Sequence, residues 1–353
     1  MIGILGGGQL GRMLALSAAK LGFKTHIYSD ETESCAFNVA TATTRAKYDD
    51  QDALGRFAGA CDVVTFEFEN VPDATAHYLA DHVPVAPGSG ALAVAQDRLL
   101  EKNFVAGLGI ATAPYRDVQS EAGAAEAFAA LGGGPAVLKT RRLGYDGKGQ
   151  RIVRTAEECR VALADFGAVP AILEKFVDFA FEASVVAARG RDGDFAAYDP
   201  PHNEHENHIL RRSTVPAPLS DSAAREAVGI ARTIAEALDY VGVLGVELFI
   251  GKSGEIAVNE IAPRVHNSGH WTMEACAVSQ FEQHIRAVAG WPLGDAARHS
   301  DAVMQNIIGA EVEEWLALAD RKEGLHIYGK RFVRSGRKMG HITRLSPLGN
   351  LPR

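Results

Sequence analysis

The N-terminal segment alternates between apolar runs and glycine-rich or polar stretches, in the order strand, helix, strand. Residues 2–5 are apolar, residues 6–11 are rich in glycine, and apolar residues recur at helical spacing over residues 12–21. A second apolar run follows at residues 25–28. This order predicts a parallel α/β domain, which we expect to end at the glycine turn near residue 90.

Two later apolar runs, joined by a short turn, predict a β-hairpin. Residues 242–250 and 256–261 are the strands, and residues 252–254 form the turn. With this turn, Glu247 falls opposite Glu260 on one face of the sheet. Two carboxylates on an apolar face repel each other, and Mg²⁺ would relieve the repulsion. The alternative is an acidic pair that faces solvent.

The segment after this hairpin is dense in groups that carry chemistry. Pro263 ends the second strand, because proline donates no backbone hydrogen bond. Arg264, His266, Asn267 and His270 then follow one another closely. Polar clusters at the end of a buried strand form the sites of many α/β enzymes, so we expect a site here.

The middle of the chain predicts a small unit with a glycine loop. Residues 136–140 form a strand that carries Lys139, residues 141–150 contain glycines and basic side chains, and residues 151–153 return as a strand. Such a loop can close over phosphates as a lid, although it lacks the Gly-Lys-Ser/Thr ending of a P-loop. The alternative for Lys139 is a lysine that protects an edge strand from aggregation.

Three long helices are predicted between the strands. One covers residues 91–106, a second follows Ser220 as its N-cap, and a third covers residues 272–289. Arg98 and Lys102 are four residues apart in the first helix and could both lie on a solvated face.

Two further groups of charged residues are candidates for substrate binding. Glu67 and Glu69 follow an alternating pattern over residues 62–68, so they would share one face of a strand and meet either a substrate or solvent. In the tail, Lys330 and Arg337 belong to a basic cluster around a glycine. That cluster can bind a phosphomonoester, and a solvated tail is the alternative.

Composition excludes several classes of protein. A chain of 353 residues is expected to form two or three domains. The net charge of −8 argues against a nucleic-acid partner. No apolar run is long enough for a membrane span, and the N-terminus lacks the basic region of a signal peptide. The cysteines are scattered without a Cys-x-x-Cys motif, which suits a reducing cytoplasm.

Two rival interpretations arise from short motifs. Gly6, Gly8 and Gly11 fit the fingerprint of dinucleotide-binding domains, and Asp30 lies where a ribose-binding acid is expected. Taken alone, this favours a nicotinamide-dependent oxidoreductase. Histidines recur at every third position over residues 202–208, which could suggest a metal site. The flanking residues predict loop and strand, however, and not the helix that would align these side chains.

Residues 259–271 read Asn-Glu-Ile-Ala-Pro-Arg-Val-His-Asn-Ser-Gly-His-Trp. They resemble the signature of the N5-carboxyaminoimidazole ribonucleotide synthetases, a family of ATP-grasp carboxylating ligases in purine biosynthesis. Residues 144–150 resemble the family's Gly-Tyr-Asp-Gly-x-Gly-Gln loop, and residues 328–341 resemble its Tyr-Gly-Lys and Gly-Arg-Lys-Met-Gly-His segments. The resemblance extends from Gly6 to His341.

The resemblance implies a fold of mixed α/β and α+β class. This is the ATP-grasp fold with a Rossmann-like N-terminal domain, a small lid domain and a central and C-terminal catalytic domain. The expected boundaries are residues 1–90 for the Rossmann-like domain, 91–177 for a linker helix and the lid, 178–295 for the catalytic subdomain and 296–353 for a C-terminal lobe. A homodimer in the cytoplasm is also implied.

The resemblance further implies which residues bind ATP and Mg²⁺. The ATP-binding residues would be Arg98, Lys139, Gly144, Tyr145, Asp146, Gly147, Lys148, Gly149, Gln150, Glu174, Lys175, Phe176, Val177, Glu182, His205, Asn259 and Glu260. Glu247 and Glu260 would hold two Mg²⁺ ions.

The implied reaction joins bicarbonate to the amine of 5-aminoimidazole ribonucleotide, with ATP converted to ADP and phosphate through carboxyphosphate and CO₂. The catalytic residues would be Asp146, Arg264, His266, Asn267 and His270. Asp146 or one of the histidines would handle the amine proton. The ribonucleotide would contact Gln9, Leu10, Glu67, Glu69, Lys330 and Arg337.

The nearest alternative is a sister ATP-grasp ligase with another acceptor, such as a formate-using glycinamide ribonucleotide transformylase or a biotin carboxylase. The His-Asn-Ser-Gly-His-Trp segment at residues 266–271 argues against both. A non-catalytic nucleotide sensor is another possibility. It is disfavoured because a sensor need not keep the acidic pair and Lys139.

Overall fold

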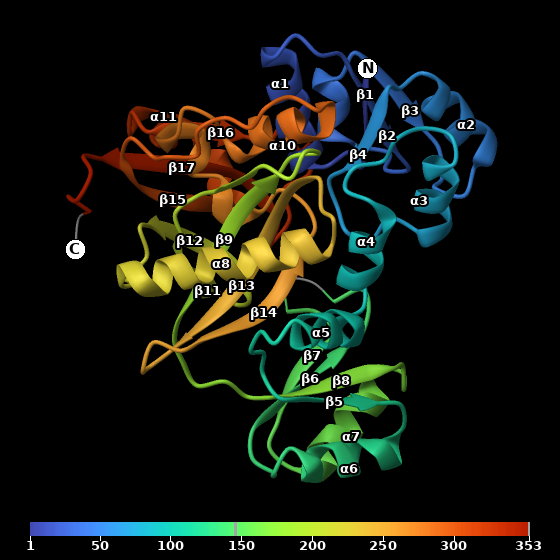
Figure 1. Cartoon of the computed structure of the whole chain (residues 1–353), viewed down its shortest axis with the longest axis vertical. Coiled ribbons are helices and arrows are strands. Elements are labelled where there is room, and N and C mark those ends of the chain that lie inside the picture. Colours follow the sequence, from blue (N-terminus) through green and yellow to red (C-terminus); the bar gives the residue numbers. More distant parts are fainter. Residues whose placement is uncertain (145–146, 352–353) are drawn as a thin grey trace.

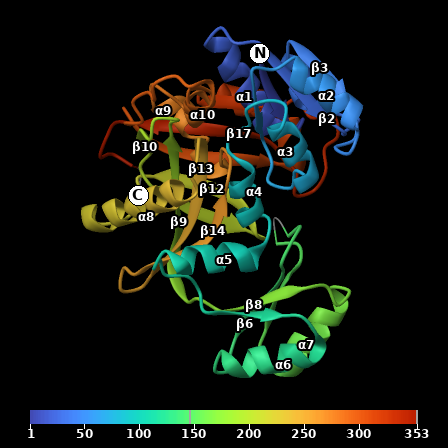
Figure 2. The same ribbon diagram turned by 45° about the vertical axis from the view of Figure 1, so that its right-hand side comes forward.

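The computed structural model describes residues 1–144 and 147–351, whose strands form three sheets. Figure 1 shows the N-terminal sheet at one end of the molecule and a small unit of residues 115–175 at the other end. The largest sheet, which includes the C-terminal strands, lies between them. A view turned by 45° gives the same arrangement (Figure 2).

The N-terminal domain is a parallel sheet covered by helices, as predicted. Its strand order is β3 (Ala42–Arg45), β2 (Thr25–Ser29), β1 (Ile2–Leu5) and β4 (Val63–Phe66). Helices α1 (Gln9–Lys20), α2 (Gln51–Gly59) and α3 (Asp73–Ala80) and a 3₁₀ turn (Cys35–Val39) accompany it. Leu14 of α1 and Phe57 of α2 are fully buried among the apolar side chains of the strands. Each helix thus covers the sheet with its apolar stripe.

The helix predicted over residues 91–106 is in fact two helices, α4 (Ser89–Ala95) and α5 (Arg98–Gly107). Asp97 is extended, and its carboxylate accepts hydrogen bonds from the backbone N–H groups of Leu99 and Leu100. It therefore caps α5 and interrupts the helix. The alternative of a solvated face for Arg98 and Lys102 is also wrong, because Lys102 is buried.

The lid is a separate antiparallel sheet in the order β5 (Tyr115–Val118), β8 (Ala171–Lys175), β6 (Ala136–Thr140) and β7 (Gln150–Val153). Helices α6 (Glu121–Ala130) and α7 (Ala156–Asp165) complete a core of its own, which includes Leu138, Cys159 and Leu173. Strand β6 lies inside this sheet. The interpretation of Lys139 as an edge-strand lysine is therefore wrong.

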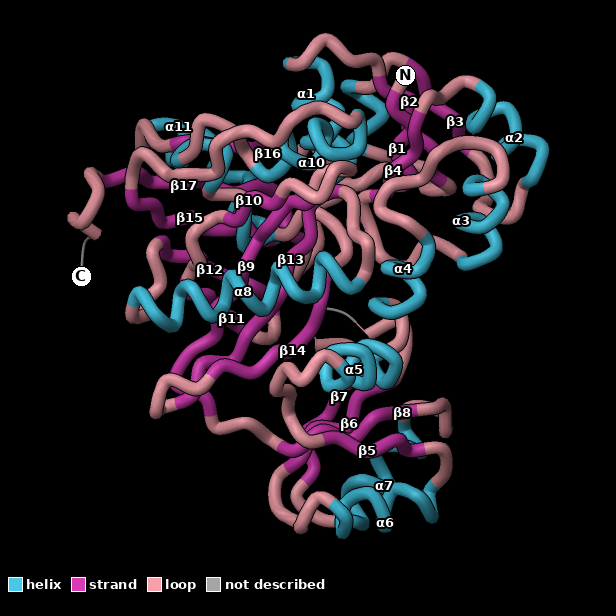
Figure 3. The backbone as a smooth tube through the Cα atoms, viewed as in Figure 1, coloured by secondary structure: helices cyan, strands magenta, loops and turns pink. Residues whose placement is uncertain are grey.

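The central sheet is mainly antiparallel, and Figure 3 shows its strands running through the middle of the molecule. The order is β14 (Ile256–Ala262), β13 (Gly242–Gly251), β9 (Phe179–Arg189), β11 (His202–Glu206), β12 (Ile209–Val215), β15 (Asp301–Ile308), β17 (Lys338–Ser346) and β16 (Gly324–Ile327), with β10 (Phe195–Ala197) beside β9. Helix α8 (Asp221–Ala237) buries Ile234 against it. Ser220 caps α8 as predicted, since its hydroxyl accepts from the Ala223 N–H.

The helix predicted over residues 272–289 is also divided, into α9 (Thr272–Ala275) and α10 (Gln280–Ala289). Cys276 is extended and forms an isolated antiparallel β-bridge with Arg298, and Ser279 caps α10. Two 3₁₀ turns (Asn267–Gly269 and Gly309–Glu314) and α11 (Trp315–Asp320) complete the described elements. No helix in the described part of the chain is long and apolar enough to cross a bilayer.

Candidate active site

A cavity of about 1260 Å³ lies where the N-terminal domain, the lid and the central sheet meet. The predicted site residues that line it are Gln9, Leu10, Glu67, Glu69, Arg98, Lys139, Gly144, Gly147, Lys148, Gln150, Glu174, Lys175, Phe176, Val177, Glu182, His205, Glu247, Asn259, Glu260, Arg264, His266 and Asn267. Residues far apart in the sequence are thus brought to one place. Tyr145 and Asp146 lie outside the described residues, so their roles stay predictions.

The acidic pair has the predicted register, since Glu247 is the partner of Glu260 across β13 and β14. Next to this pair, Val258 is opposite Leu248, so Asn259 is an extra residue that forms a β-bulge. In a regular strand, neighbouring side chains point to opposite faces. The bulge breaks this alternation, and both Asn259 and Glu260 line the cavity.

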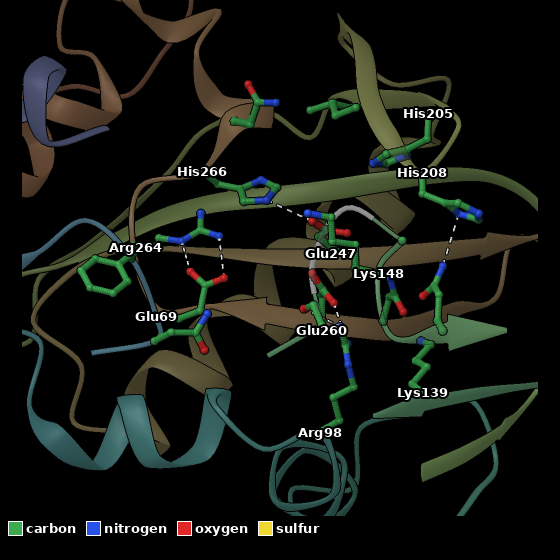
Figure 4. Close-up of a pocket in the computed structure, with 18 of the residues that line it drawn as sticks. Glu69, Arg98, Lys139, Lys148, His205, His208, Glu247, Glu260, Arg264 and His266 are labelled. Atoms are coloured by element: carbon green, nitrogen blue, oxygen red, sulfur yellow. Dashed lines mark hydrogen bonds and ion pairs between the residues drawn. The ribbon is translucent and has the colours of Figure 1, made fainter. Parts of the chain in front are cut away.

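Each carboxylate of the pair has a basic partner (Figure 4). His266 Nε2 lies 3.0 Å from Glu247 Oε1, and Arg98 Nη1 donates to Glu260 Oε2 at 3.0 Å. Burial alone would raise the pKa of Glu247, but the hydrogen bond and charge of His266 lower it to about 2. Glu247 therefore stays ionised at neutral pH.

The oxygens of this hairpin fit a divalent cation. The buried Oδ1 of Asn259 has no hydrogen-bond partner among the described residues, and it lies beside two carboxylates. Mg²⁺ prefers such oxygen ligands and usually takes the rest from water and substrate phosphates. No group of three or more His, Cys, Asp or Glu side chains suited to a metal occurs in residues 1–144 and 147–351. Phosphate oxygens of a nucleotide would therefore have to complete the site.

The lid contributes a lysine and a glycine loop. Lys139 donates to Glu174 at 2.9 Å inside a buried pair. Gly147 has a φ of +78°, and a Cβ there would lie 2.6 Å from His208. Gln150 Nε2 is 3.3 Å from His208 Nδ1. The loop thus rests against the turn between β11 and β12, and His208, noted earlier only within a histidine tract, belongs to the cavity.

An aromatic end of the cavity was not predicted. The rings of Phe179 and Phe249 are stacked, with centroids 4.8 Å apart and planes 11° apart, and both residues line the cavity. Close to them, His205 Nδ1 is 2.7 Å from Glu182. A signal for Phe249 was present, because it follows Glu247 by two residues on one strand and so shares its face.

Glu67 closes the N-terminal glycine loop from inside. Its carboxylate accepts hydrogen bonds from the backbone N–H groups of Gly8 at 2.5 Å and Gly11 at 2.7 Å, and burial raises its pKa. The predicted strand over residues 62–68 is therefore wrong at its end, since β4 stops before Glu67. A dinucleotide pyrophosphate would need these same amides. Because a carboxylate occupies them, the nicotinamide interpretation does not hold.

Three groups that can hold an anion lie between the acidic pair and the glycine loop. Glu69 holds Arg264 by two hydrogen bonds, one of them from Nη2 to Oε1 at 3.2 Å (Figure 4). His266 follows, and both polar side-chain atoms of Asn267 are buried without a hydrogen-bond partner among the described residues. Such unsatisfied buried groups point to a bound ligand.

Some predicted residues are not part of the cavity wall: Gly149, His270, Lys330 and Arg337. His270 is only 1% exposed, and its ring lies against Phe281 and His341 in the core. Burial lowers its pKa well below the usual value. The expectation that His270 contacts the reacting groups is therefore wrong. Lys330 instead donates to the backbone carbonyl of Lys338, which does line the cavity.

Family models cover most of the chain. Residues 1–96 match the ribonucleotide synthetase preATP-grasp domain, residues 103–281 match the ATP-grasp domain, and residues 302–348 match the phosphoribosylaminoimidazole carboxylase C-terminal domain. The ATP-grasp match alone includes the lid and the acidic hairpin.

Full-length relatives agree with these models. The N5-carboxyaminoimidazole ribonucleotide synthase of Brucella melitensis is 52% identical over 98% of this chain and 96% of its own. The solved ADP complex of an N5-carboxyaminoimidazole ribonucleotide synthetase has a TM-score of 0.94 at 41% identity and covers 98% of this chain and 92% of the other. The enzyme of Aspergillus clavatus, solved with ADP and 5-aminoimidazole ribonucleotide, has a TM-score of 0.91 at 31% identity, with 98% and 93% covered. The chain therefore belongs to the N5-carboxyaminoimidazole ribonucleotide synthase family of ATP-grasp ligases.

Proposed function

We propose that this protein carboxylates the amine of 5-aminoimidazole ribonucleotide with bicarbonate, driven by ATP. The observation that carries the proposal is the single cavity, which is lined by the acidic hairpin, the anion-holding groups and the N-terminal glycine loop together. A nucleotide, a small anion and an acceptor can therefore meet in one cavity. The relative from Aspergillus clavatus was solved with ADP and this ribonucleotide together.

ATP is proposed to bind between the lid and the central sheet. Phe179 and Phe249 offer an apolar surface for the base, next to the backbone of residues 174–177. Lys139 and Lys148 are the cations for the phosphates. The cavity residues Arg98, Gly144, Gly147, Gln150, Glu182 and His205 and the adjacent Gly149 complete the proposed ATP site.

Glu247, Asn259 and Glu260 are the proposed ligands of Mg²⁺, and the two carboxylates can serve two ions. When bound, the metal offsets the charge that develops on the β- and γ-phosphates during transfer. The residues themselves keep the nucleotide phosphates in line with the anion-holding groups. Proximity of this kind is a large part of catalysis of phosphoryl transfer.

Bicarbonate is a weak electrophile, so the proposed reaction activates it first. One of its oxygens attacks the γ-phosphorus of ATP, the bond to the β-phosphate oxygen breaks, and ADP and carboxyphosphate result. Arg264, His266 and Asn267 would hold this anion. Carboxyphosphate releases phosphate and CO₂, and the ribonucleotide amine attacks the carbon and loses a proton. Asp146 or His266 is proposed to take that proton.

The ribonucleotide is proposed to lie at the N-terminal end of the cavity. Glu67 takes the Gly8 and Gly11 N–H groups at the start of α1, and the N–H groups of Gln9 and Leu10 between them are the ones proposed for the phosphate. Lys330 and Arg337 remain proposed phosphate ligands, and the nearby Lys338 on the cavity wall supports this. Glu67 would shape the floor of this end. Glu69 would act through Arg264.

The oligomeric state and the location in the cell are also proposed. A homodimer is supported by exposed apolar side chains on the C-terminal strands and α11, where Trp315 is 54% and Leu316 is 67% exposed. A cytoplasmic location is supported by cysteines that are all unpaired in the structure.

The test is a comparison of acceptors. ADP release is measured with Mg²⁺ and bicarbonate, in the presence of 5-aminoimidazole ribonucleotide or of glycinamide ribonucleotide with formate. We expect strong stimulation by the first acceptor only, with labelled bicarbonate appearing in an acid-labile product. Stimulation by the second acceptor would identify a sister ligase. Nucleotide binding without any turnover would identify a sensor.

A further inference from the structure

The outer edge of the central sheet is covered partly by a backbone segment, since the Val258 N–H donates to the Ala111 carbonyl at 2.8 Å, and partly by side chains of α5. Strand β14 is the last in the sheet, so its outward backbone groups need other partners. The Glu101 carboxylate accepts from the Ile261 N–H at 2.6 Å. The Lys102 ammonium donates to the carbonyls of Val258 at 3.3 Å and Asn259 at 2.7 Å. Two polar side chains of α5 thus serve the backbone groups of β14 beyond this short bridge.

Lys102 is buried to a degree that is unusual for a lysine, with 1% of its surface exposed. A buried ammonium is costly unless its protons find acceptors. Lys102 has the two carbonyls and also Glu174 Oε2 at 3.8 Å. That carboxylate belongs to lid strand β8 and holds Lys139 as well. One buried cation therefore touches both the metal-binding strand and the lid.

The carbonyl that Lys102 contacts most closely is that of the bulged residue. A shift of pairing by one residue turns every side chain of a strand to the other face. Without a donor at the carbonyl of Asn259, β14 could return to regular pairing. Either Asn259 or Glu260 would then leave the cavity.

We propose that Lys102 is a positioning residue for the metal site: its ammonium holds the bulge at Asn259, so that Asn259 and Glu260 face the Mg²⁺-nucleotide together. This inference rests on the proposed function for the identity of the ligand. Lys102 does not line the cavity, so we expect it to contact neither the nucleotide nor the metal. Its effect passes through the backbone of β14. In other metalloproteins, residues that do not touch the metal also orient the residues that bind it.

The test is the affinity for ADP with and without Mg²⁺, measured by calorimetry, which needs no turnover. In Lys102→Met, we expect the tightening of ADP binding by Mg²⁺ to fall by about tenfold or more, the range typical for residues that orient metal ligands. Binding of ADP without Mg²⁺ should change much less. Loss of a residue that only stabilises the fold would change the ADP affinity equally with and without Mg²⁺.

The matched control is Lys20→Met. Lys20 also forms an ion pair with a buried carboxylate, Glu282 at 2.7 Å, but it lies far from the nucleotide end and outside the cavity wall. We expect this variant to keep the full effect of Mg²⁺. Lys102→Leu is the second test variant, because it is smaller and also lacks an N–H donor, and it serves if the methionine variant does not fold.

The outcomes separate the inference from the proposed function. If either folded Lys102 variant keeps the effect of Mg²⁺ to within about twofold, or loses ADP affinity equally with and without Mg²⁺, the inference is wrong. If the wild-type protein binds ADP no more tightly with Mg²⁺ than without it, the proposed function itself fails. That failure would concern the wild-type metal site and would not depend on Lys102.

Discussion

Glu69 and Arg264 form a two-point ion pair across the boundary between the N-terminal domain and the central sheet. Glu69 lies in the loop after β4, and Arg264 lies just after β14. Burial alone would raise the pKa of Glu69, but the Arg264 guanidinium lowers it to about 2. Paired hydrogen bonds fix the plane of a guanidinium, so this carboxylate sets how Arg264 meets an anion.

Glu69→Gln should therefore impair carboxylation without weakening ATP binding. The neutral amide cannot hold Arg264 at both points, and small misplacements of a catalytic group cost about tenfold or more in rate. We expect kcat to fall while the KM for ATP stays close to normal. Glu33→Gln removes only the exposed pair with Arg331 and is the control. A rise mainly in the KM for ATP would show that Glu69 serves the nucleotide.

Glu260→Gln tests the acidic pair as the metal site. Loss of one carboxylate ligand removes charge stabilisation of several kcal/mol, so turnover should fall by roughly 100-fold or more. The fold should persist, because Glu260 is part of the cavity wall and not of the core. The exposed Glu236→Gln on α8 is the control. Near-normal turnover in the Glu260 variant would remove this residue from the metal site.

Gly147→Ala tests the glycine loop as a lid. The new Cβ would lie 2.6 Å from His208, so the loop could not rest against the β11–β12 turn. We expect more ATP hydrolysed per carboxylated product, because water then reaches carboxyphosphate. Gly132→Ala is matched, since this lid glycine has a similar φ of +84° with no atom within 4 Å of its added Cβ. An equal ratio of ATP hydrolysed to carboxylated product in both variants would show that the loop does not act as a lid.

His284 predicts how stability depends on pH. Its Nδ1 accepts from the Val243 N–H and its Nε2 contacts Thr65, and burial lowers its pKa to about 3. The unfolded chain takes up this proton once the pH falls below about 6.5, whereas the folded protein does not until about 3. The stability contribution is therefore complete above that window and is lost as the pH decreases through it.

His284→Gln can make both hydrogen bonds without titrating. Between about pH 6 and pH 5, the wild type should lose more unfolding free energy than this variant, by up to about 1.4 kcal/mol per pH unit. Denaturant unfolding at the two pH values measures the difference. Identical slopes would mean that His284 is not neutral in the folded protein.

The hairpin shows which features the sequence predicted correctly and which feature the prediction missed. The turn at residues 252–254 and the period of two placed Glu247 opposite Glu260 correctly. The bulge at Asn259 was missed, although the apolar spacing changes from two residues between Ile256 and Val258 to three between Val258 and Ile261. It depends on Lys102, whose contacts cross more than a hundred residues of chain.

The same limit explains the errors at single residues. Glu67 continued an alternating pattern, but its partners are amides of the first glycine loop. His270 and His266 looked equivalent in the motif. The 3₁₀ turn at residues 267–269 separates them and places His270 among the rings of Phe281 and His341. Side-chain identity predicted the chemistry, while long-range packing decided which groups reach the cavity.

The central claim is that bicarbonate is phosphorylated in this cavity before carbon is transferred. The most direct measurement uses bicarbonate labelled with ¹⁸O, with ATP, Mg²⁺ and 5-aminoimidazole ribonucleotide, and analyses the released phosphate by mass spectrometry. We predict that each phosphate carries one oxygen from bicarbonate, and that its release depends on the ribonucleotide. Phosphate whose new oxygen comes from water would contradict the account.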